Sequence, residues 1–134
     1  MKYMLDTNVI IGCLRRKQSL IESVEKNGIG HDLFISTITY GEIMTGIHSN
    51  DTPRRRVALH KVLAPMTILD YDQEASSHFG FLKNKTKKST IGPYDLQIAA
   101  HAISKRLTLV THNTKEFSKI EELNIVDWEV DVLY

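Results

Sequence analysis

The strongest constraint on the fold of this chain is the alternation of short apolar runs with longer segments of helical periodicity. Strands that alternate with helices form parallel sheets, because the helix between two strands returns the chain to the same edge. We therefore predict an α/β fold, with a central, mostly parallel, twisted sheet of four to five strands and helices on both faces. The predicted strands are residues 2–5, 33–35, 66–69, 107–110 and 125–128.

Capping residues and prolines mark the starts of several predicted helices. Thr52 and Pro53 supply an N-cap and a first-turn proline. Asp70 or Asp72 can cap the long segment 73–88 in the same manner. The helix that follows Pro53 contains residues 57–63, and the other predicted helices contain residues 9–14, 19–27, 38–47, 93–103 and 117–120.

Size and composition fit one domain, which we assign to residues 1–134. Of the 134 residues, 42% are hydrophobic and 25% are charged, which is enough apolar surface to offset the entropy lost on folding. No stretch reaches the roughly 20 apolar residues of a membrane span, and no apolar signal region precedes Asp6. The single cysteine, Cys13, cannot form an internal disulfide. We therefore expect a cytoplasmic protein without membrane contact.

Three acidic residues stand apart from other charges. Asp6, Glu42 and Asp95 are each the only formally charged residue in a long stretch of sequence. A carboxylate in a mostly apolar neighbourhood is costly unless a cation or several hydrogen-bond donors compensate for it. Each acid therefore needs a partner that its neighbours in sequence do not supply. The three stretches are residues 3–14, 33–50 and 89–104.

The predicted positions of these acids bring them together. Asp6 ends the first strand, Glu42 lies in the helix after the second, and Asp95 lies in the first turn of a later helix. In an open parallel sheet such positions gather at the carboxyl ends of the strands, where ligands bind. Asn113, in the turn after the fourth strand, adds a neutral oxygen. Oxygen ligands without cysteine favour Mg²⁺ or Mn²⁺, so we predict a metal site for phosphodiester hydrolysis.

Ordinary structural roles remain open for the same residues. Asp6 can be a helix N-cap, Asp95 can favour the positive end of its helix, and Asn113 can be a turn residue. Glu42 fits a solvated helix face less well, because its neighbours on the helix are uncharged.

The net charge of +1 does not by itself indicate a nucleic-acid partner, so such contacts must come from local groups. Lys85, Lys87 and Lys88 belong to a lysine-rich run that can be a solvated surface or can hold a phosphate backbone. Tyr94, beside the isolated Asp95, can stack on a base or pack against the sheet.

Four motifs in this order resemble the PIN-domain ribonucleases, specifically the VapC-type toxins of toxin-antitoxin pairs. They span nearly the whole chain, and their acids lie at matching positions. The motifs are MLDTN at residues 4–8, STITYGEI at 36–43, GPYDLQIA at 92–99 and LVTHNTKEF at 109–117.

The resemblance implies a PIN fold, dependence on Mg²⁺ or Mn²⁺, and endonucleolytic cleavage of RNA. It also implies a homodimer, and inhibition by a VapB-type antitoxin in a toxin-antitoxin hetero-oligomer. The form of residues 92–95 is similar to the branch that cuts tRNA, including initiator tRNA in the anticodon region. By the same analogy, an inhibitor that inserts an arginine or lysine into the acidic cluster would displace the metal.

The resemblance also assigns site residues. Asp6, Glu42 and Asp95 match the acidic metal-binding positions of the family. Asn113 falls where many PIN domains have a fourth acid, which leaves this site one negative charge short. Polar positions that line the family's site are matched by Thr7, Asn8 and Thr111.

We therefore predict a growth-arresting ribonuclease toxin with Asp6, Glu42, Asp95 and Asn113 as its catalytic residues. One alternative is a structure-specific DNA nuclease that uses the same acids. Another is a non-catalytic nucleic-acid-binding module in which the acids hold a structural ion.

Overall fold

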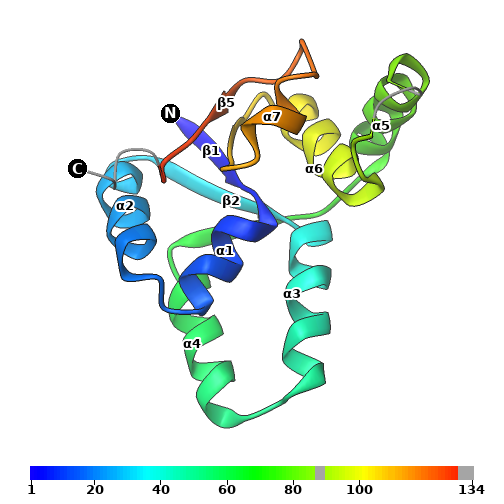
Figure 1. Cartoon of the computed structure of the whole chain (residues 1–134). Helices are drawn as coiled ribbons and strands as arrows, with labels where there is room; N and C mark the ends of the chain where they lie inside the picture. The colour runs from blue at the N-terminus through cyan, green and yellow to red at the C-terminus, as the bar shows by residue number, and fades with distance from the viewer. Residues whose placement is uncertain (87–89, 130–134) are drawn as a thin grey trace.

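The computed structural model describes residues 1–86 and 90–129, and it contains a five-stranded sheet (Figure 1). All neighbouring strands are parallel, and their order is β3-β2-β1-β4-β5. The predicted α/β fold with a parallel sheet is therefore confirmed. The strands are β1 (Lys2–Leu5), β2 (Asp32–Ser36), β3 (Met66–Leu69), β4 (Thr108–Val110) and β5 (Ile125–Val126).

The order in which strands are added reverses between β1 and β4. From β1 the chain first adds β2 and β3 on one side, and it later adds β4 and β5 on the other. In an open parallel sheet, such a reversal leaves a ligand-binding crevice outside the carboxyl ends of the two strands. Asp6 follows β1 and Thr111 follows β4, and the amide of Asp6 donates a 2.9 Å hydrogen bond to the carbonyl of Val110. The fold therefore places Asp6 and Thr111 at this crevice.

The helices begin largely where the sequence predicts. Thr52 accepts a hydrogen bond from the amide of Arg55, and Pro53 is the first helical residue. Asp72, and not Asp70, caps the next helix. Among the described residues, no helix is both long and apolar enough to cross a bilayer. The helices are α1 (Thr7–Leu14), α2 (Gln18–Gly28), α3 (Thr37–Ser49), α4 (Pro53–Leu63), α5 (Gln73–Lys85), α6 (Pro93–Ser104) and α7 (Thr114–Phe117).

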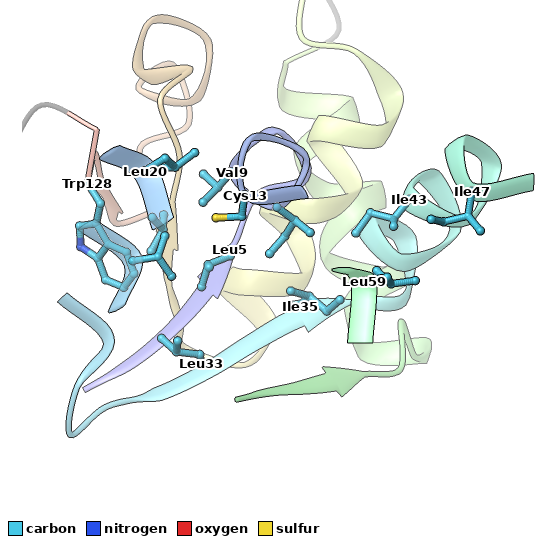
Figure 2. Packing of buried hydrophobic residues seen from close by; sticks show 13 residues of the cluster. Leu5, Val9, Cys13, Leu20, Leu33, Ile35, Ile43, Ile47, Leu59 and Trp128 are labelled. Carbon is cyan, nitrogen blue, oxygen red and sulfur yellow. The ribbon is translucent and has the colours of Figure 1, made fainter. Parts of the chain in front are cut away.

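One apolar core lies between the sheet and helices α1 to α4 (Figure 2). Leu5 and Ile35 enter it from β1 and β2, and Cys13 enters it from α1. Trp128 also belongs to this core, and the centroid of its ring lies 5.0 Å from that of Tyr3. This core fixes α1, whose first turn follows Asp6.

A second apolar core lies on the opposite side of the strands. Met4 belongs to it although Leu5 belongs to the first, because successive side chains of a strand point to opposite faces. Leu109 of β4, Ile98 of α6 and Phe117 of α7 complete its centre. Both faces of the sheet are therefore covered, as predicted.

β2 is one residue longer at each end than predicted and β4 one residue shorter at its start, and three other elements end before their predicted ends. The helix predicted over 117–120 ends at Phe117, and the strand predicted over 125–128 ends at Val126, before Trp128 turns into the first core. α5 ends at Lys85, short of the predicted end at residue 88.

Candidate active site

Asp6 is a deeply buried acid at the carboxyl edge of the sheet, with 1% of its surface exposed. Its Oδ1 accepts a 2.8 Å hydrogen bond from the amide of Thr7, and its Oδ2 accepts one of 2.9 Å from Thr111 Oγ1. Burial raises the pKa of Asp6 to about 6 against the lowering effect of these bonds, and the charges of Asp95 and Glu42 add to the rise. Asp6 is thus the N-cap of α1, and that role does not remove the cost of ionising it.

Thr7 connects the start of α1 to Glu42 on α3. Its Oγ1 donates a 2.7 Å hydrogen bond to Glu42 Oε1 and shares a 3.0 Å hydrogen bond with the hydroxyl of Thr39. A hydroxyl has a single proton, so Thr39 supplies the proton of the bond that the two threonines share. Thr39 is fully buried, which makes this connection well shielded from water. The sequence did not single out Thr39, although it lies within the second motif.

Asp95 lies half-buried in the first turn of α6. Burial raises its pKa, and the charges of Glu42 and Glu116 raise it further. A helix N-terminus alone would lower the pKa of an acid, so its surroundings outweigh the helix dipole. Asp6, Glu42 and Asp95 therefore lie within electrostatic reach of one another, as the sequence predicted.

The turn after β4 brings Thr111 and Asn113 to the same edge. Thr111 is fully buried, and its hydroxyl both donates to Asp6 and accepts a 3.0 Å hydrogen bond from the amide of Asn113. The side chain of Asn113 is half-buried and does not cap α7. Asn8 lies in the first turn of α1 with its side chain exposed.

The three acids meet at this edge of the sheet. Within residues 1–86 and 90–129, no lysine, arginine or histidine forms an ion pair with any of them. Three side chains can hold one metal ion without moving when their ligand atoms lie within about 4.8 Å of one another, and the oxygens of these three acids do not. Among the described residues, one other group of side chains meets this limit. The donors are carboxylates, hydroxyls and an amide, which suits a hard divalent ion such as Mg²⁺ or Mn²⁺. A cation is what this set of acids lacks, so the residues fit the predicted metal.

The group that meets the limit is His112, Asp127 and Glu129, after β4 and β5. His112 Nδ1 lies 2.9 Å from Asp127 Oδ2 and 3.1 Å from Glu129 Oε2, while Lys17 Nζ lies 3.0 Å from Glu129 Oε1. The side chain of His112 is 63% exposed. His112 already contacts both acids and Lys17 forms an ion pair with Glu129, so this group is a network of polar contacts at the surface.

Two further charged residues reach the site and were not singled out from the sequence. The first is Glu116, whose charge raises the pKa of Asp95 and whose Oε2 lies 3.2 Å from Lys119 Nζ in an ion pair. Glu116 lies in the last of the four motifs, which was an available signal. Arg15 lines a cavity of about 200 Å³ together with Glu42, and nothing in its sequence surroundings marked it.

The residues predicted to contact RNA are only partly placed near the acids. Tyr94 directly precedes Asp95 and is 58% exposed. Lys85 is engaged with Glu122, whose Oε2 lies 3.1 Å from its Nζ. Lys87 and Lys88 lie outside the described residues.

Comparison with known proteins identifies a family that spans nearly the whole chain. Residues 3–123 match the PIN domain. This chain belongs to the PIN domain family. Among curated relatives of this PIN domain protein, ribonuclease VapC2 of Haemophilus influenzae is 37% identical over 96% of this chain and 98% of its own length. The tRNA(fMet)-specific endonuclease VapC of Salmonella typhimurium is 35% identical, with the same coverage of both chains. The PIN domain protein is thus a member of the VapC group, as its motifs predicted.

Solved structures agree with this assignment of the PIN domain protein. VapBC2 from Rickettsia felis, bound to a DNA fragment from the promoter, matches with a TM-score of 0.88 and 30% identity over 96% of this chain and 99% of that chain. DNA-bound VapBC from Salmonella typhimurium matches with a TM-score of 0.85 and 33% identity over 96% of this chain and 98% of that chain.

Proposed function

We propose that this PIN domain protein is the toxin of a type II toxin-antitoxin pair and acts as a metal-dependent endoribonuclease. The observation that carries the proposal is the buried carboxylate of Asp6 at the reversal point of the sheet, with two more acids in electrostatic reach and, among the described residues, no ion pair to any of the three. The names of its relatives, ribonuclease VapC2 and tRNA(fMet)-specific endonuclease VapC, support RNA as the substrate.

In this proposal Asp6, Glu42 and Asp95 hold Mg²⁺ or Mn²⁺. When bound, such an ion activates a water and neutralises charge on a phosphorus centre. The chain's part is to orient the ligands: the amide of Thr7 and the hydroxyl of Thr111 hold both oxygens of Asp6, and the hydroxyl of Thr7 holds Glu42.

Other residues line the same edge in supporting roles. Asn113 offers a neutral oxygen or a hydrogen bond where a fourth acid would add charge, and its amide is already fixed by Thr111. Asn8 presents an exposed amide on the first turn of α1. Arg15 has an exposed guanidinium in the cavity beside Glu42, which suits a phosphate of the RNA strand.

For the substrate, we propose tRNA, and within it initiator tRNA cut in the anticodon region. Relatives from Shigella flexneri and Salmonella typhimurium are named tRNA(fMet)-specific endonuclease. The exposed ring of Tyr94 beside Asp95 can stack on an unpaired base, which a loop such as the anticodon loop provides. We also propose that Lys85, Lys87 and Lys88 contact the phosphate backbone of the RNA.

For partners, we propose a VapB-type antitoxin and a homodimer of this chain within a hetero-oligomeric complex. The solved structures of VapBC from Rickettsia felis and Salmonella typhimurium support the antitoxin. An apolar cavity of about 660 Å³ between α1, α2 and α4 is open at the surface and contains Val57, which is 55% exposed. An amphipathic helix of the antitoxin would fit such a groove.

The experiment that tests the function uses antitoxin-free protein and total bacterial RNA, with Mg²⁺ or with EDTA. Sequencing of new RNA ends should find discrete cuts in initiator tRNA that depend on the metal. The matched control is Asp6→Asn, which keeps the size of the side chain and one of its two acceptor atoms and removes its charge.

Single-stranded and flap DNA are offered in parallel with tRNA. Cleavage of DNA alone would favour the DNA nuclease. A large rise in melting temperature with Mg²⁺ and no cleavage of any nucleic acid would favour the non-catalytic module.

A further inference from the structure

A fully buried histidine joins the two helices that carry Glu42 and Asp95. His101, on α6, has none of its surface exposed, and its Nδ1 lies 2.8 Å from Ser36 Oγ. Ser36 is the last residue of β2 and the N-cap of α3, which leaves the end of that strand (Figure 1). Helices α3 and α6 also pack against each other. The contact between His101 and Ser36 is thus a polar junction between the acid-bearing helices.

The direction of the hydrogen bond at this junction follows from the cap. Ser36 Oγ accepts a 3.0 Å hydrogen bond from the amide of Ile38, which leaves its own proton free to donate. We therefore assign Nδ1 of His101 as the acceptor of this proton, which corresponds to a neutral ring with its proton on Nε2. Burial lowers the pKa of His101, which favours the same neutral form.

Packing alone does not account for a histidine at this place. Its ring meets that of Tyr71 edge-on, with the centroids 5.5 Å apart, and the amide of Tyr71 donates to Thr37 Oγ1 at 3.0 Å. The Nε2 atom of His101 is buried and, among the described residues, forms no hydrogen bond at normal geometry, although the ring also interacts with the backbone of Asp70. An apolar side chain of similar size would fill the space without that cost. What the histidine ring adds beyond filling the space is its polar contact with Ser36.

The junction lies where a small shift would move both acids. Glu42 is six residues after Ser36 on α3, and Asp95 is six residues before His101 on α6. Each distance is about 9 Å along a helix, at a rise of about 1.5 Å per residue. Because helices are stiff, the relative position of α3 and α6 at the junction sets how closely the two carboxylates approach.

We propose that His101 is a positioning residue, which holds α6 to the capped start of α3 so that Asp95 and Glu42 can share one divalent ion. This inference rests on the proposed metal-dependent function. His101 acts through Ser36 and touches neither the acids nor the substrate.

The test measures the affinity of the antitoxin-free protein for Mn²⁺. The concentration of free Mn²⁺ is measured by electron paramagnetic resonance during the titration. His101→Leu removes the acceptor for Ser36, and we expect its Mn²⁺ affinity to fall by about 10- to 100-fold, the usual effect of losing a supporting group. His101→Asn keeps an acceptor oxygen near the position of Nδ1, and we expect it to recover most of the affinity. All variants are measured at a temperature at which thermal unfolding shows them folded.

The control variant is Leu20→Ala, which weakens the first core far from the junction and should leave Mn²⁺ affinity unchanged. Wild-type affinity in His101→Leu, equally weak binding in His101→Asn, or equal weakening by Leu20→Ala would each overturn the proposal. If His101→Leu does not fold, His101→Asn is compared with His101→Gln, whose oxygen lies near Nε2 and should not restore binding.

The outcomes separate this inference from the function on which it rests. Wild-type protein that binds Mn²⁺ but cuts no RNA would overturn the ribonuclease and leave the positioning role intact. Wild-type protein that binds no Mn²⁺ would overturn both.

Discussion

Asp6 and Cys13 are both buried ionisable residues, but they lie in regions of opposite character. Cys13 is 5% exposed within the first apolar core, where burial, with smaller effects of Glu25 and Glu129, raises the pKa of its thiol to about 11. A neutral thiol behaves there as a small apolar side chain. Asp6 has a pKa of about 6, so near neutral pH the folded chain must keep a carboxylate that burial disfavours. The apolar core therefore stabilises the folded chain, whereas the ionised carboxylate of Asp6 at the carboxyl edge of the sheet destabilises it.

The distribution of buried polar side chains shows the same division. Among the described residues, most of them lie near the carboxyl ends of the strands or on the helices that meet there. Ser23, on α2, is the exception, and its hydroxyl donates to the carbonyl of Trp128. The others are Asp6, Thr7, Ser36, Thr39, His101 and Thr111.

The sharpest way to separate the two regions is Asp6→Asn. If Asp6 is the proposed metal ligand, loss of this carboxylate should lower RNA cleavage by about a thousandfold, equal to about 4 kcal/mol of activation free energy. Cleavage of the RNA substrate at fixed Mg²⁺ measures the effect. Activity equal to wild type in a folded variant would mean that the carboxyl edge is not the catalytic site.

Leu20→Ala should destabilise the other region, the first apolar core. Leu20 is 1% exposed in the first core, and its truncation should cost about 3 to 4 kcal/mol of unfolding free energy through lost burial and a cavity. Urea unfolding measures the loss. Cleavage by the folded protein should stay at the wild-type rate, and a change in cleavage would show that the two regions are coupled.

The free energy of unfolding should depend on pH because Asp6 titrates at different pH values in the folded and unfolded states. The pKa rises from 3.8 to about 6 in the folded state, so the folded state binds the proton more tightly. Without metal, stability from this group should therefore fall as pH rises from about 4 to about 6, by about 3 kcal/mol in all. Asp6→Asn should remove this fall, so the difference between the two unfolding free energies across this range measures it. A difference that does not vary with pH would contradict the assignment.

Thr111→Val should have the smallest effect of the set. The variant keeps the shape of the side chain but removes the hydroxyl that donates to Asp6 at 2.9 Å. We expect the Mn²⁺ affinity to fall by about tenfold, or about 1.4 kcal/mol, as for other groups that support a metal ligand. The control is Thr108→Val, at the start of β4, which should bind Mn²⁺ like wild type.

Local features of the fold followed from the sequence. Thr52, Pro53 and Asp72 start their helices as predicted, because capping depends on side chains within one turn of the helix. The ends of short elements were less accurate, as at Phe117 and Val126. Each of those elements stops where a later apolar residue, Ile120 or Trp128, turns into a core, and such a turn depends on distant contacts.

The candidate site divides in the same way. Isolation of Asp6, Glu42 and Asp95 among uncharged residues was visible in the sequence, since a lone carboxylate in an apolar segment needs a partner. Glu116 was visible only as part of a motif, and Arg15 carried no signal. Their relation to the acids depends on the packing of α7, α1 and α3 at the edge of the sheet.

By itself, the sequence determined the alternation of strands and helices, the caps, the apolar faces and the isolated acids. The tertiary structure decided the order of the strands and the partners of each buried polar group. Asp6 and Thr111 are 105 residues apart, and Ser36 and His101 are 65 apart. Local propensity acts over a few residues, so only the packing of the sheet and its helices can bring such pairs into hydrogen-bond contact.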